Sequence, residues 1–235
     1  GVPSAKHGNR SVSSHCGSAD VLEACGVNLM ASAEVARRCL DEVGVCFLFA
    51  PRYHSGVKHA MPARHALGTR TMFNLLGPLI NPAAPPVQVM GVYDEALCMP
   101  LARTLGMLGC TDAMVVHGSG LDEVALHGPT RAALYRNEEV SMLTIVPEEA
   151  GLKRYPIEAL AGGEPEENAA WLQRLLAGDG DPAHIAAVSL NSGVLLFTAG
   201  VVDTIADGVE FARRSLREGA PARKLTALME VSHAG

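Results

Sequence analysis

Short apolar runs alternate with a segment of helical character in the first half of the chain, and this alternation constrains the fold most strongly. Residues 45–50 (VCFLFA), 87–92 (VQVMGV) and 113–117 (AMVVH) have the length and the nearly unbroken apolarity of buried strands. Residues 94–109 lie between the second and third runs and carry a helical pattern. Strand, helix and strand in this order indicate an α/β sheet with crossover helices.

Serine caps and terminal glycines predict two short helices before the first strand. The first helix has Ser18 as its N-cap and Gly26 as its stop. The second has Ser32 as its N-cap and Gly44 as its stop. Both helices are short enough to pack beside the strand at residues 45–50.

The remaining segments are expected to be helical, apart from one small meander. Residues 55–76 are expected to be helical with interruptions, ending at Gly77-Pro78. Residues 124–146 predict extended segments that turn near Asn137. Polar residues and a glycine interrupt the apolar stretch at residues 185–202, which therefore predicts a buried helix. The C-terminal helices are expected at about residues 164–177, 182–199, 204–218 and 220–231.

Charge and composition exclude several classes of protein. The chain has 19 basic and 25 acidic residues and a net charge of −6, which disfavours a nucleic-acid-binding surface because such a surface needs a basic stripe. Neither a signal peptide nor an uncharged apolar run of membrane-spanning length is present in the sequence. The six cysteines form no CxxC pair, so we expect free thiols in a reducing, cytoplasmic setting.

Residues 6–14 (KHGNRSVSS) concentrate groups that bind phosphate. Lys6 and Arg10 supply positive charge, and a histidine, an amide and three hydroxyls lie within the same nine residues. The helix expected at Ser18 follows, and a helix start offers unpaired N–H groups and the positive end of its dipole. The segment therefore favours a polyphosphate ligand. The alternative is a solvated polar loop before a capped helix.

Two further sets of residues suggest chemistry. Asp122 and Glu123 follow the strand at residues 113–117, at the edge where α/β sheets bind ligands, and adjacent carboxylates can hold Mg²⁺. A polar turn with two surface acids is the alternative. Arg64 has a guanidinium fork that can grip a carboxylate, although a helix-surface arginine would look the same. The histidines lack HxxxH and HExxH spacing, and neither a GxSxG motif nor a P-loop is present.

Taken together, these motifs resemble the anthranilate phosphoribosyltransferase family, and the resemblance runs in order through nearly the whole chain. The segments that carry it are KHGNR at 6–10, VSS at 12–14, GSADVLE at 17–23, FAP at 49–51, His54, Lys58-His59, LGTRT at 67–71, FNLLGPL at 73–79, Asn81-Pro82, VHG at 116–118, GLDE at 120–123, Gly162-Gly163, ENA at 167–169 and Leu190-Asn191.

The resemblance implies a large α/β domain with a mixed central sheet flanked by helices, together with part of a small helical domain. Residues 1–235 would form this phosphoribosyltransferase domain, N-terminally incomplete, with about residues 55–79 as an excursion into the helical domain. The family's upstream Gly-Thr-Gly-Gly-Asp loop and Asn-x-Ser-Thr segment are not in this sequence. The implied reaction moves the phosphoribosyl group of phosphoribosyl pyrophosphate (PRPP) to the amine of anthranilate, in tryptophan biosynthesis. Its products are N-(5-phosphoribosyl)anthranilate and pyrophosphate.

The resemblance also implies site residues. Asn9 and Arg64 match anthranilate contacts, with Arg64 on the carboxylate, and His7 lies beside that site. These three are the candidate catalytic residues. Asp122 and Glu123 match the carboxylates that hold Mg²⁺, and two ions are expected. The segment around PRPP is matched by Lys6, His7, Gly8, Asn9, Arg10, Ser11, Val12, Ser13 and Ser14, with a further contact from Ser18.

The resemblance implies a homodimer formed through the helical domain and allows association with an anthranilate synthase component. Two alternatives stay open at this point. A pyrimidine nucleoside phosphorylase-like enzyme shares the general fold, but Asp122 and Glu123 argue against it. A non-catalytic relative or fragment of the fold is the other, and the net charge of −6 disfavours a version of it that binds nucleic acid.

Overall fold

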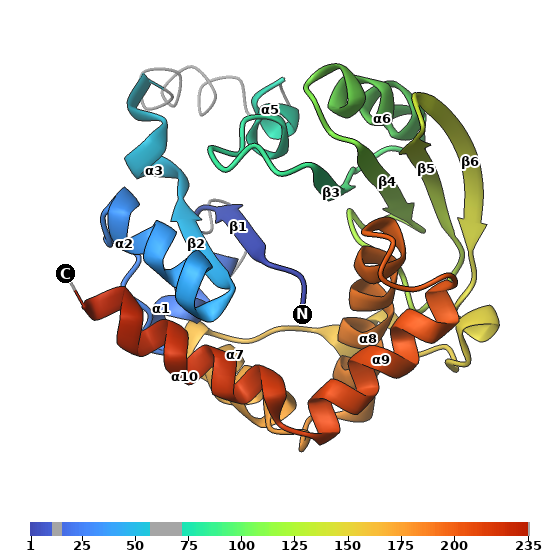
Figure 1. Cartoon of the computed structure of the whole chain (residues 1–235). Helices are drawn as coiled ribbons and strands as arrows, with labels where there is room; N and C mark the ends of the chain where they lie inside the picture. Colours follow the sequence, from blue (N-terminus) through green and yellow to red (C-terminus); the bar gives the residue numbers. More distant parts are fainter. Residues whose placement is uncertain (11–15, 57–71, 235) are drawn as a thin grey trace. The chain divides into compact units, whose positions relative to one another are not determined.

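A computed structural model describes residues 1–10, 16–56 and 72–234 of the chain (Figure 1). The chain divides into two compact units. Unit 1 comprises Gly1–Ala83, Gly162–Arg174 and Pro221–Gly235, and unit 2 comprises Ala84–Ala161 and Leu175–Ala220.

Unit 1 is built on two parallel strands, β1 (Ser4–Gly8) and β2 (Val45–Phe49). Ser4 lies opposite Val45 and Gly8 lies opposite Phe49. Its helical segments are α1 (Ser18–Ala24), α2 (Ala33–Arg38), the π-helical turn η1 (Cys39–Val43), α3 (Ala50–Tyr53), α5 (Phe73–Leu79), most of α7 (Pro165–Leu176) and nearly all of α10 (Ala220–His233).

The side chains of β2 alternate between two apolar clusters. Cys46 and Leu48 pack with residues of α2, η1 and α10. Phe47 and Phe49 point to the other face and pack with Ala19 of α1. Successive strand residues face opposite sides of a sheet, so a strand covered on both sides is apolar throughout. This explains the unbroken apolar run that predicted the strand.

One of the two predicted N-caps is confirmed and the other is wrong. The Ser32 hydroxyl accepts the N–H of Val35, 3.2 Å away, at the start of α2. In α1 the N-cap is Gly17, and Ser18 is the first helical residue. The N–H of Gly17 donates to the carboxylate of Asp20, the third helical residue, over 2.9 Å, which is the half of a capping box that binds the N-cap backbone.

The dipeptide Gly77-Pro78 does not end a helix, because it lies inside α5, which continues to Leu79. A proline this close to a helix end removes one N–H donor without disrupting a long hydrogen-bonded ladder. Residues 57–71 lie outside the described part of the chain. The excursion of residues 55–79 into a helical domain therefore stays a prediction.

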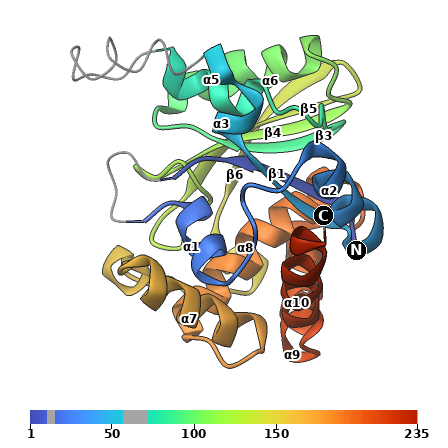
Figure 2. The same ribbon diagram turned by 90° about the vertical axis from the view of Figure 1, so that its left-hand side faces the viewer.

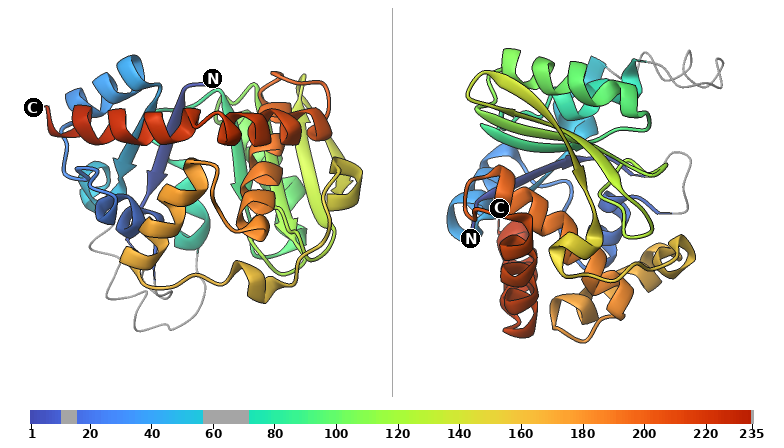
Figure 3. Two further views of the ribbon diagram at one scale, coloured as in Figure 1. Left: turned by 90° about the horizontal axis from the view of Figure 1, so that it is seen from below. Right: turned by 90° about the vertical axis from the view of Figure 1, so that its right-hand side faces the viewer.

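Unit 2 contains a mixed four-stranded sheet in the order β3 (Val87–Gly91), β4 (Asp112–Gly118), β5 (Thr130–Arg136) and β6 (Glu139–Ile145). β3 and β4 are parallel, whereas the other two pairs are antiparallel. Asn137 and Glu138 join β5 to β6 with φ angles of 53° and 63°, which confirms the predicted turn. Figure 3 (right) shows this hairpin as a long twisted ribbon. The described strands thus form two separate hydrogen-bonded sheets, of two and four strands.

Helices cover both faces of the four-stranded sheet, with α6 and α8 on opposite sides in Figure 2. Met114 and Val116 of β4 pack with Leu190 and Val194 of α8 in the main apolar core. None of the helices in the described ranges is long and apolar enough to span a membrane. The helical segments of unit 2 are η3 (Glu95–Leu97), α6 (Cys98–Met107), η4 (Pro147–Ala150), η5 (Ile157–Leu160), α8 (Pro182–Thr198) and α9 (Ile205–Arg217).

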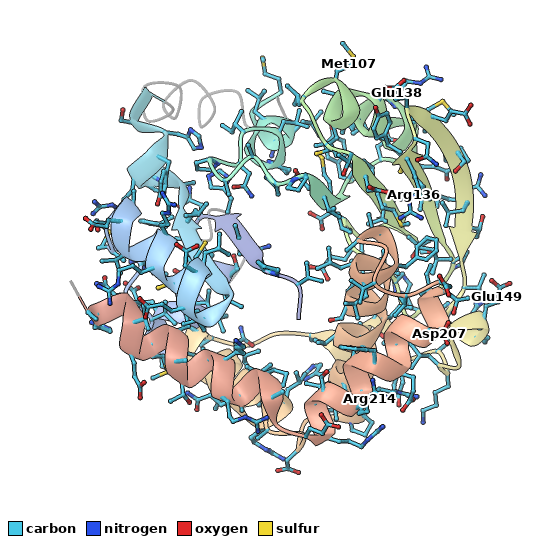
Figure 4. All side chains as sticks on the ribbon, in the orientation of Figure 1. Met107, Arg136, Glu138, Glu149, Asp207 and Arg214 are labelled. Carbon is cyan, nitrogen blue, oxygen red and sulfur yellow. The ribbon has the colours of Figure 1, made fainter. Side chains whose placement is uncertain are left out.

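Arg136, labelled in Figure 4, ties the end of β5 to the end of α8. Its Nε donates to Asp112 over 2.5 Å, and its Nη2 donates to the backbone carbonyls of Phe197 and Thr198 over 3.1 and 2.8 Å. The guanidinium also lies 5.5 Å from the centroid of the Phe197 ring. A cation at the carboxyl end of a helix satisfies its last carbonyls and complements its dipole.

The crossing of α8 and α9 depends on two facing glycines. A Cβ on Gly193 would lie 2.8 Å from the backbone nitrogen of Val209 and 3.0 Å from the carbonyl oxygen of Ile205. A Cβ on Gly208 would lie 2.6 Å from the carbonyl oxygen of Gly193. Backbone atoms of one helix therefore occupy the space that a side chain on the other would need.

We expect Gly193→Ala to lower the free energy of unfolding by about 1–3 kcal/mol, because overpacking outweighs the better helix propensity of alanine. Urea denaturation measures the change. Ser192→Ala, on the neighbouring position of α8, is the control and should shift the midpoint little. A Gly193→Ala variant as stable as the unsubstituted chain would contradict this account of the crossing.

Candidate active site

The segment predicted to bind phosphate begins inside β1 and leaves the sheet at its carboxyl end. Residues 6–8 are the last three of the strand, and residues 9–10 follow it directly. The side chains of Lys6 and Arg10 are exposed. Because β1 and β2 are parallel, the same edge also receives His54, which follows β2 and the short helix α3.

Two histidines meet at this edge. The ring centroids of His7 and His54 lie 5.0 Å apart, with the planes inclined at 75°. The Nδ1 atom of His7 lies 3.2 Å from the carbonyl oxygen of Gly77, which assigns the proton of a neutral ring to Nδ1. Within the described part of the chain, the buried Nε2 atoms of both histidines have no hydrogen-bond partner.

Burial lowers the pKa of His7, and this effect outweighs the opposing hydrogen bond to Gly77. The ring is therefore neutral near pH 7 and can orient a neighbouring group through Nε2 without adding charge. The sequence assigned His54 no catalytic or binding role, although His54 is one of the residues that carry the family resemblance and it follows the apolar run at residues 45–50.

Helix α1 lies against the end of β1. A Cβ on Gly8 would lie 3.0 Å from Oγ of Ser18 and 3.1 Å from the ring of Phe47, so a larger residue there would make the serine or the ring shift by a few tenths of an ångström. The guanidinium of Arg10 is paired with Glu23 of α1, with 2.7 Å between Nη2 and Oε1. This hydrogen bond lowers the pKa of the Glu23 carboxyl. Arg10 thus bonds to an acid of the chain itself.

The structure brings most of the predicted phosphate-binding residues together at the junction of β1 and α1. These are Lys6, His7, Gly8, Asn9, Arg10 and Ser18. The other residues predicted to bind PRPP or anthranilate lie outside the described ranges, so their assignments stay predictions. They are Ser11, Val12, Ser13, Ser14 and Arg64.

The predicted metal-binding acids lie in unit 2, just after β4. Gly118 and Leu121 exchange backbone hydrogen bonds of 2.9 and 3.0 Å around a tight turn. Ser119 within this turn has a φ of 48°, and Gly120 has a φ of 98°. Asp122 and Glu123 follow the turn as exposed residues.

Two side chains fix the backbone around this acidic pair. His117 donates from Nδ1 to the carbonyl oxygen of Val92 over 2.9 Å, so its Nε2 accepts the N–H of Gly120 over 3.3 Å. Asn191 of α8 accepts the N–H of Val124 and donates to its carbonyl oxygen, both over 3.1 Å. The backbone is therefore held on both sides of Asp122 and Glu123.

Glycines allow the acidic pair to lie close to the sheet. A Cβ on Gly91, the last residue of β3, would lie 1.5 Å from the carbonyl oxygen of Asp122. A Cβ on Gly118 would lie 2.2 Å from the carbonyl oxygen of Glu123. Either side chain would push the acidic turn away from the carboxyl ends of β3 and β4.

Asp122 and Glu123 open onto a cavity of about 480 Å³. Two adjacent carboxylates with access to water fit Mg²⁺, which accepts oxygen ligands and retains several waters. Across residues 1–10, 16–56 and 72–234, no three His, Cys, Asp or Glu side chains gather closely enough to enclose a metal ion. The pair thus suits an open magnesium site. The cavity is lined by Leu121, Asp122, Glu123, Ile157, Glu158, Leu160 and Ala161.

An α/β fold with a cationic segment after one strand and an acidic turn after another is consistent with a glycosyl transferase. A family model described as "Glycosyl transferase family, a/b domain" matches residues 1–222. The anthranilate phosphoribosyltransferase of Sorangium cellulosum is 59% identical over 235 residues, covering all of this chain and 68% of that protein. That of Tolumonas auensis is 51% identical over 233 residues, covering 99% of this chain and 69% of that protein. The chain belongs to the anthranilate phosphoribosyltransferase family, which confirms the resemblance.

Solved structures agree with this membership and confirm the fold class. Anthranilate phosphoribosyltransferase from Thermus thermophilus matches with a TM-score of 0.94 and 43% identity, over 99% of this chain and 69% of that one. The enzyme from Saccharomyces cerevisiae, in complex with PRPP and Mg, matches with a TM-score of 0.87 and 26% identity, over 98% and 65% of the two chains. The chain thus spans about two thirds of the length of these relatives. The match favours a transferase over the phosphorylase-like alternative.

The lowered pKa of His7 has a consequence for stability. Unfolding returns the ring to its ordinary pKa of 6.5, whereas the folded ring titrates at lower pH. Between the two values the unfolded chain binds more protons, so the contribution of His7 is complete above about pH 6.5 and is lost as the pH falls. We expect His7→Gln to weaken the fall in stability that sets in as the pH drops below about 6.5, measured by urea denaturation.

His184→Gln, on α8 of unit 2, controls for the general effect of removing a histidine and should leave that pH dependence in place. A His7→Gln variant whose stability still falls as steeply as that of the unsubstituted chain would refute the assignment.

Proposed function

We propose that this chain transfers the phosphoribosyl group of PRPP to the amine of anthranilate, giving N-(5-phosphoribosyl)anthranilate and pyrophosphate. The observation that carries the proposal is the 59% identity to an anthranilate phosphoribosyltransferase across all 235 residues. The geometry is consistent with it, since the cationic segment and the acidic pair each follow a strand of a parallel pair.

Residues 6–14 and Ser18 form the PRPP-binding segment in this proposal. Lys6 is exposed in β1 and offers three donors to phosphate oxygens. Its positive charge stabilises the negative charge that gathers on the departing pyrophosphate. Gly8 allows the backbone to run close to Ser18, so the hydroxyl lies beside the end of the strand.

Asp122 and Glu123 hold magnesium in this proposal, and two ions are expected. When bound there, Mg²⁺ neutralises pyrophosphate charge and so favours its departure. The chain's own contribution is a fixed backbone, since His117 and Asn191 hold the segments on either side of the pair. The carboxylates thus keep their positions without a closed shell of protein ligands.

Arg64, Asn9 and His7 bind and orient anthranilate in this proposal. The guanidinium of Arg64 suits the anthranilate carboxylate, which it can hold through two hydrogen bonds. The aromatic amine is neutral near pH 7 and attacks without losing a proton first. The C–N bond forms as the bond to pyrophosphate breaks, and the nitrogen then releases its extra proton to water, so His7 is not required as a base before attack. A neutral His7 is consistent with an orienting role. Catalysis then consists of positioning and charge stabilisation.

We also propose a homodimer and a cytoplasmic setting. The homodimer and an association with an anthranilate synthase component rest on the family resemblance. The setting is supported by the cysteines, all six of which are free thiols, five of them buried. Burial raises the pKa of Cys46 and Cys98 to about 11, so both stay protonated.

Anthranilate fluorescence tests the proposed reaction. The signal should fall with time only when the chain, PRPP and Mg²⁺ are all present, and chelation of Mg²⁺ with EDTA should stop the fall. A folded sample that leaves the signal unchanged with both additions would contradict the proposed function. Asp122→Asn should raise the Mg²⁺ concentration needed for half-maximal activity.

Arg64→Ala separates the two substrates. Losing a charge-assisted contact to the carboxylate should raise the KM for anthranilate about 10- to 100-fold, while the KM for PRPP changes little. Steady-state kinetics with each substrate varied in turn measures both values. Arg37→Ala, at an exposed position of α2, is the control. Equal increases in both KM values would remove Arg64 from the carboxylate role.

A further inference from the structure

One arginine of the predicted phosphate-binding segment is already bound by acids of the chain. Arg10 donates from Nη1 and Nη2 to the two carboxylate oxygens of Glu23, the second bond being 2.7 Å long. Its Nη1 also lies 3.5 Å from Oδ1 of Asp20. A two-pronged guanidinium–carboxylate pair is the strongest common form of such a contact and fixes the direction of the side chain.

Asp20 links Arg10 to a second point in the chain. While Oδ1 faces the guanidinium, Oδ2 accepts the backbone N–H of Gly17 over 2.9 Å. Arg10 and Gly17 flank residues 11–16, which include residues 11–14 of the predicted phosphate-binding segment. One carboxylate of α1 therefore contacts the residues on both sides of that segment.

Two further contacts hold the same junction. The Arg10 guanidinium lies 5.6 Å from the centroid of the Phe49 ring, at the end of the neighbouring strand β2. Gly8 approaches Ser18 so closely that a Cβ on the glycine would lie 3.0 Å from the serine Oγ. The guanidinium is thus held by α1 on one side and by β2 on the other.

The charges at this junction oppose a direct phosphate contact by Arg10. A phosphate approaching the guanidinium would have to displace Glu23 or use the N–H groups that Glu23 leaves, and in either case it would lie near the carboxylates of Glu23 and Asp20. Asp20 also places negative charge in the first turn of α1, a helix of only seven residues. Lys6 is exposed in β1 and, among the described residues, forms no ion pair, so it stays available to a ligand whereas Arg10 is already paired.

We propose that Arg10 is a positioning residue, held by Glu23 and Asp20, and that this acidic clasp (Arg10, Asp20 and Glu23) keeps the two ends of the segment together before PRPP arrives. The inference rests on the proposed function and gives Asp20 and Glu23 of α1 a part in PRPP binding. Fixing the ends of a binding segment in advance reduces the ordering that the ligand must otherwise supply. The clasp therefore acts on PRPP binding.

The test compares Arg10→Ala, Glu23→Gln and the double variant in the full chain. Both single variants should raise the KM for PRPP by a similar factor, of about 5- to 10-fold, with kcat changed less than about 2-fold. The double variant should be no worse than either single one, because both remove the same contact. Arg10→Lys, which keeps the charge but loses the two-pronged fork, should fall between Arg10→Ala and the unsubstituted chain.

A matched pair on the same unit supplies the control. Arg38 and Glu42 form an ion pair of 3.2 Å with side-chain exposures of 44% and 54%, close to the 44% and 46% of Arg10 and Glu23. Glu42→Gln should leave the KM for PRPP unchanged. The thermal midpoint should fall by less than about 4 °C in every variant, because exposed ion pairs add little stability.

A direct phosphate contact by Arg10 predicts a change of opposite sign in the KM for PRPP of Glu23→Gln. If Arg10 were a direct phosphate ligand restrained by Glu23, then Glu23→Gln would release it and lower the KM for PRPP, while Arg10→Ala would raise it. That result, or an unchanged KM in both single variants, would overturn the clasp.

Hydrogen exchange in the ligand-free chain separates failure of the clasp from failure of the proposed function. The clasp predicts faster exchange at the backbone N–H of Gly17 in Arg10→Ala, because Asp20 then loses its second partner. Unchanged exchange there would overturn the clasp whether or not the chain is active. If the unsubstituted chain never consumes anthranilate, the proposed function fails. A role of the clasp in PRPP binding then fails as well, even if the Gly17 N–H exchanges faster in Arg10→Ala.

Discussion

Parallel pairing places the carboxyl ends of neighbouring strands at one edge, and the candidate functional residues of each unit depend on this constraint within that unit. In unit 1 it brings the end of β1 beside the end of β2, so His7 meets His54. In unit 2 it brings Gly91 beside the turn that follows β4, where the absence of a side chain lets the Asp122 peptide approach. An antiparallel partner would have placed its amino end there, and neither cluster would form.

Local patterns in the sequence were sufficient for most elements of the fold. The apolar runs at β2, β3 and β4 were found because buried strands carry no alternation, and the C-terminal helices α7 to α10 lie within about two residues of their predicted bounds. The N-cap of α1 was assigned one residue too late, because the N-cap is defined by backbone conformation and the extended backbone before this helix falls on Gly17.

The sequence predicted which residue types belong to the candidate site, but not which other residues those side chains would contact. The sequence placed Arg10 among phosphate-binding groups, yet its partner Glu23 lies in the following helix, where only the folded chain brings the two together. The support of the acidic pair by His117 and Asn191 depends on similar long-range contacts. Charge and motif identify which side chains can act. Tertiary packing decides which of them stay available to a ligand and which are used to hold the others.

The division of the chain between its two units bears on the order in which the protein forms during synthesis. Unit 1 gathers residues from the beginning, the middle and the end of the sequence, and the buried Leu228 of α10 belongs to its core. On the ribosome that core stays incomplete until α10 has emerged. The residues of unit 2 all precede α10 proper, so its sheet can close before the core of unit 1 is complete. The end of β1, with the residues predicted to bind phosphate, is therefore translated before unit 2 but gains its complete surroundings only after it.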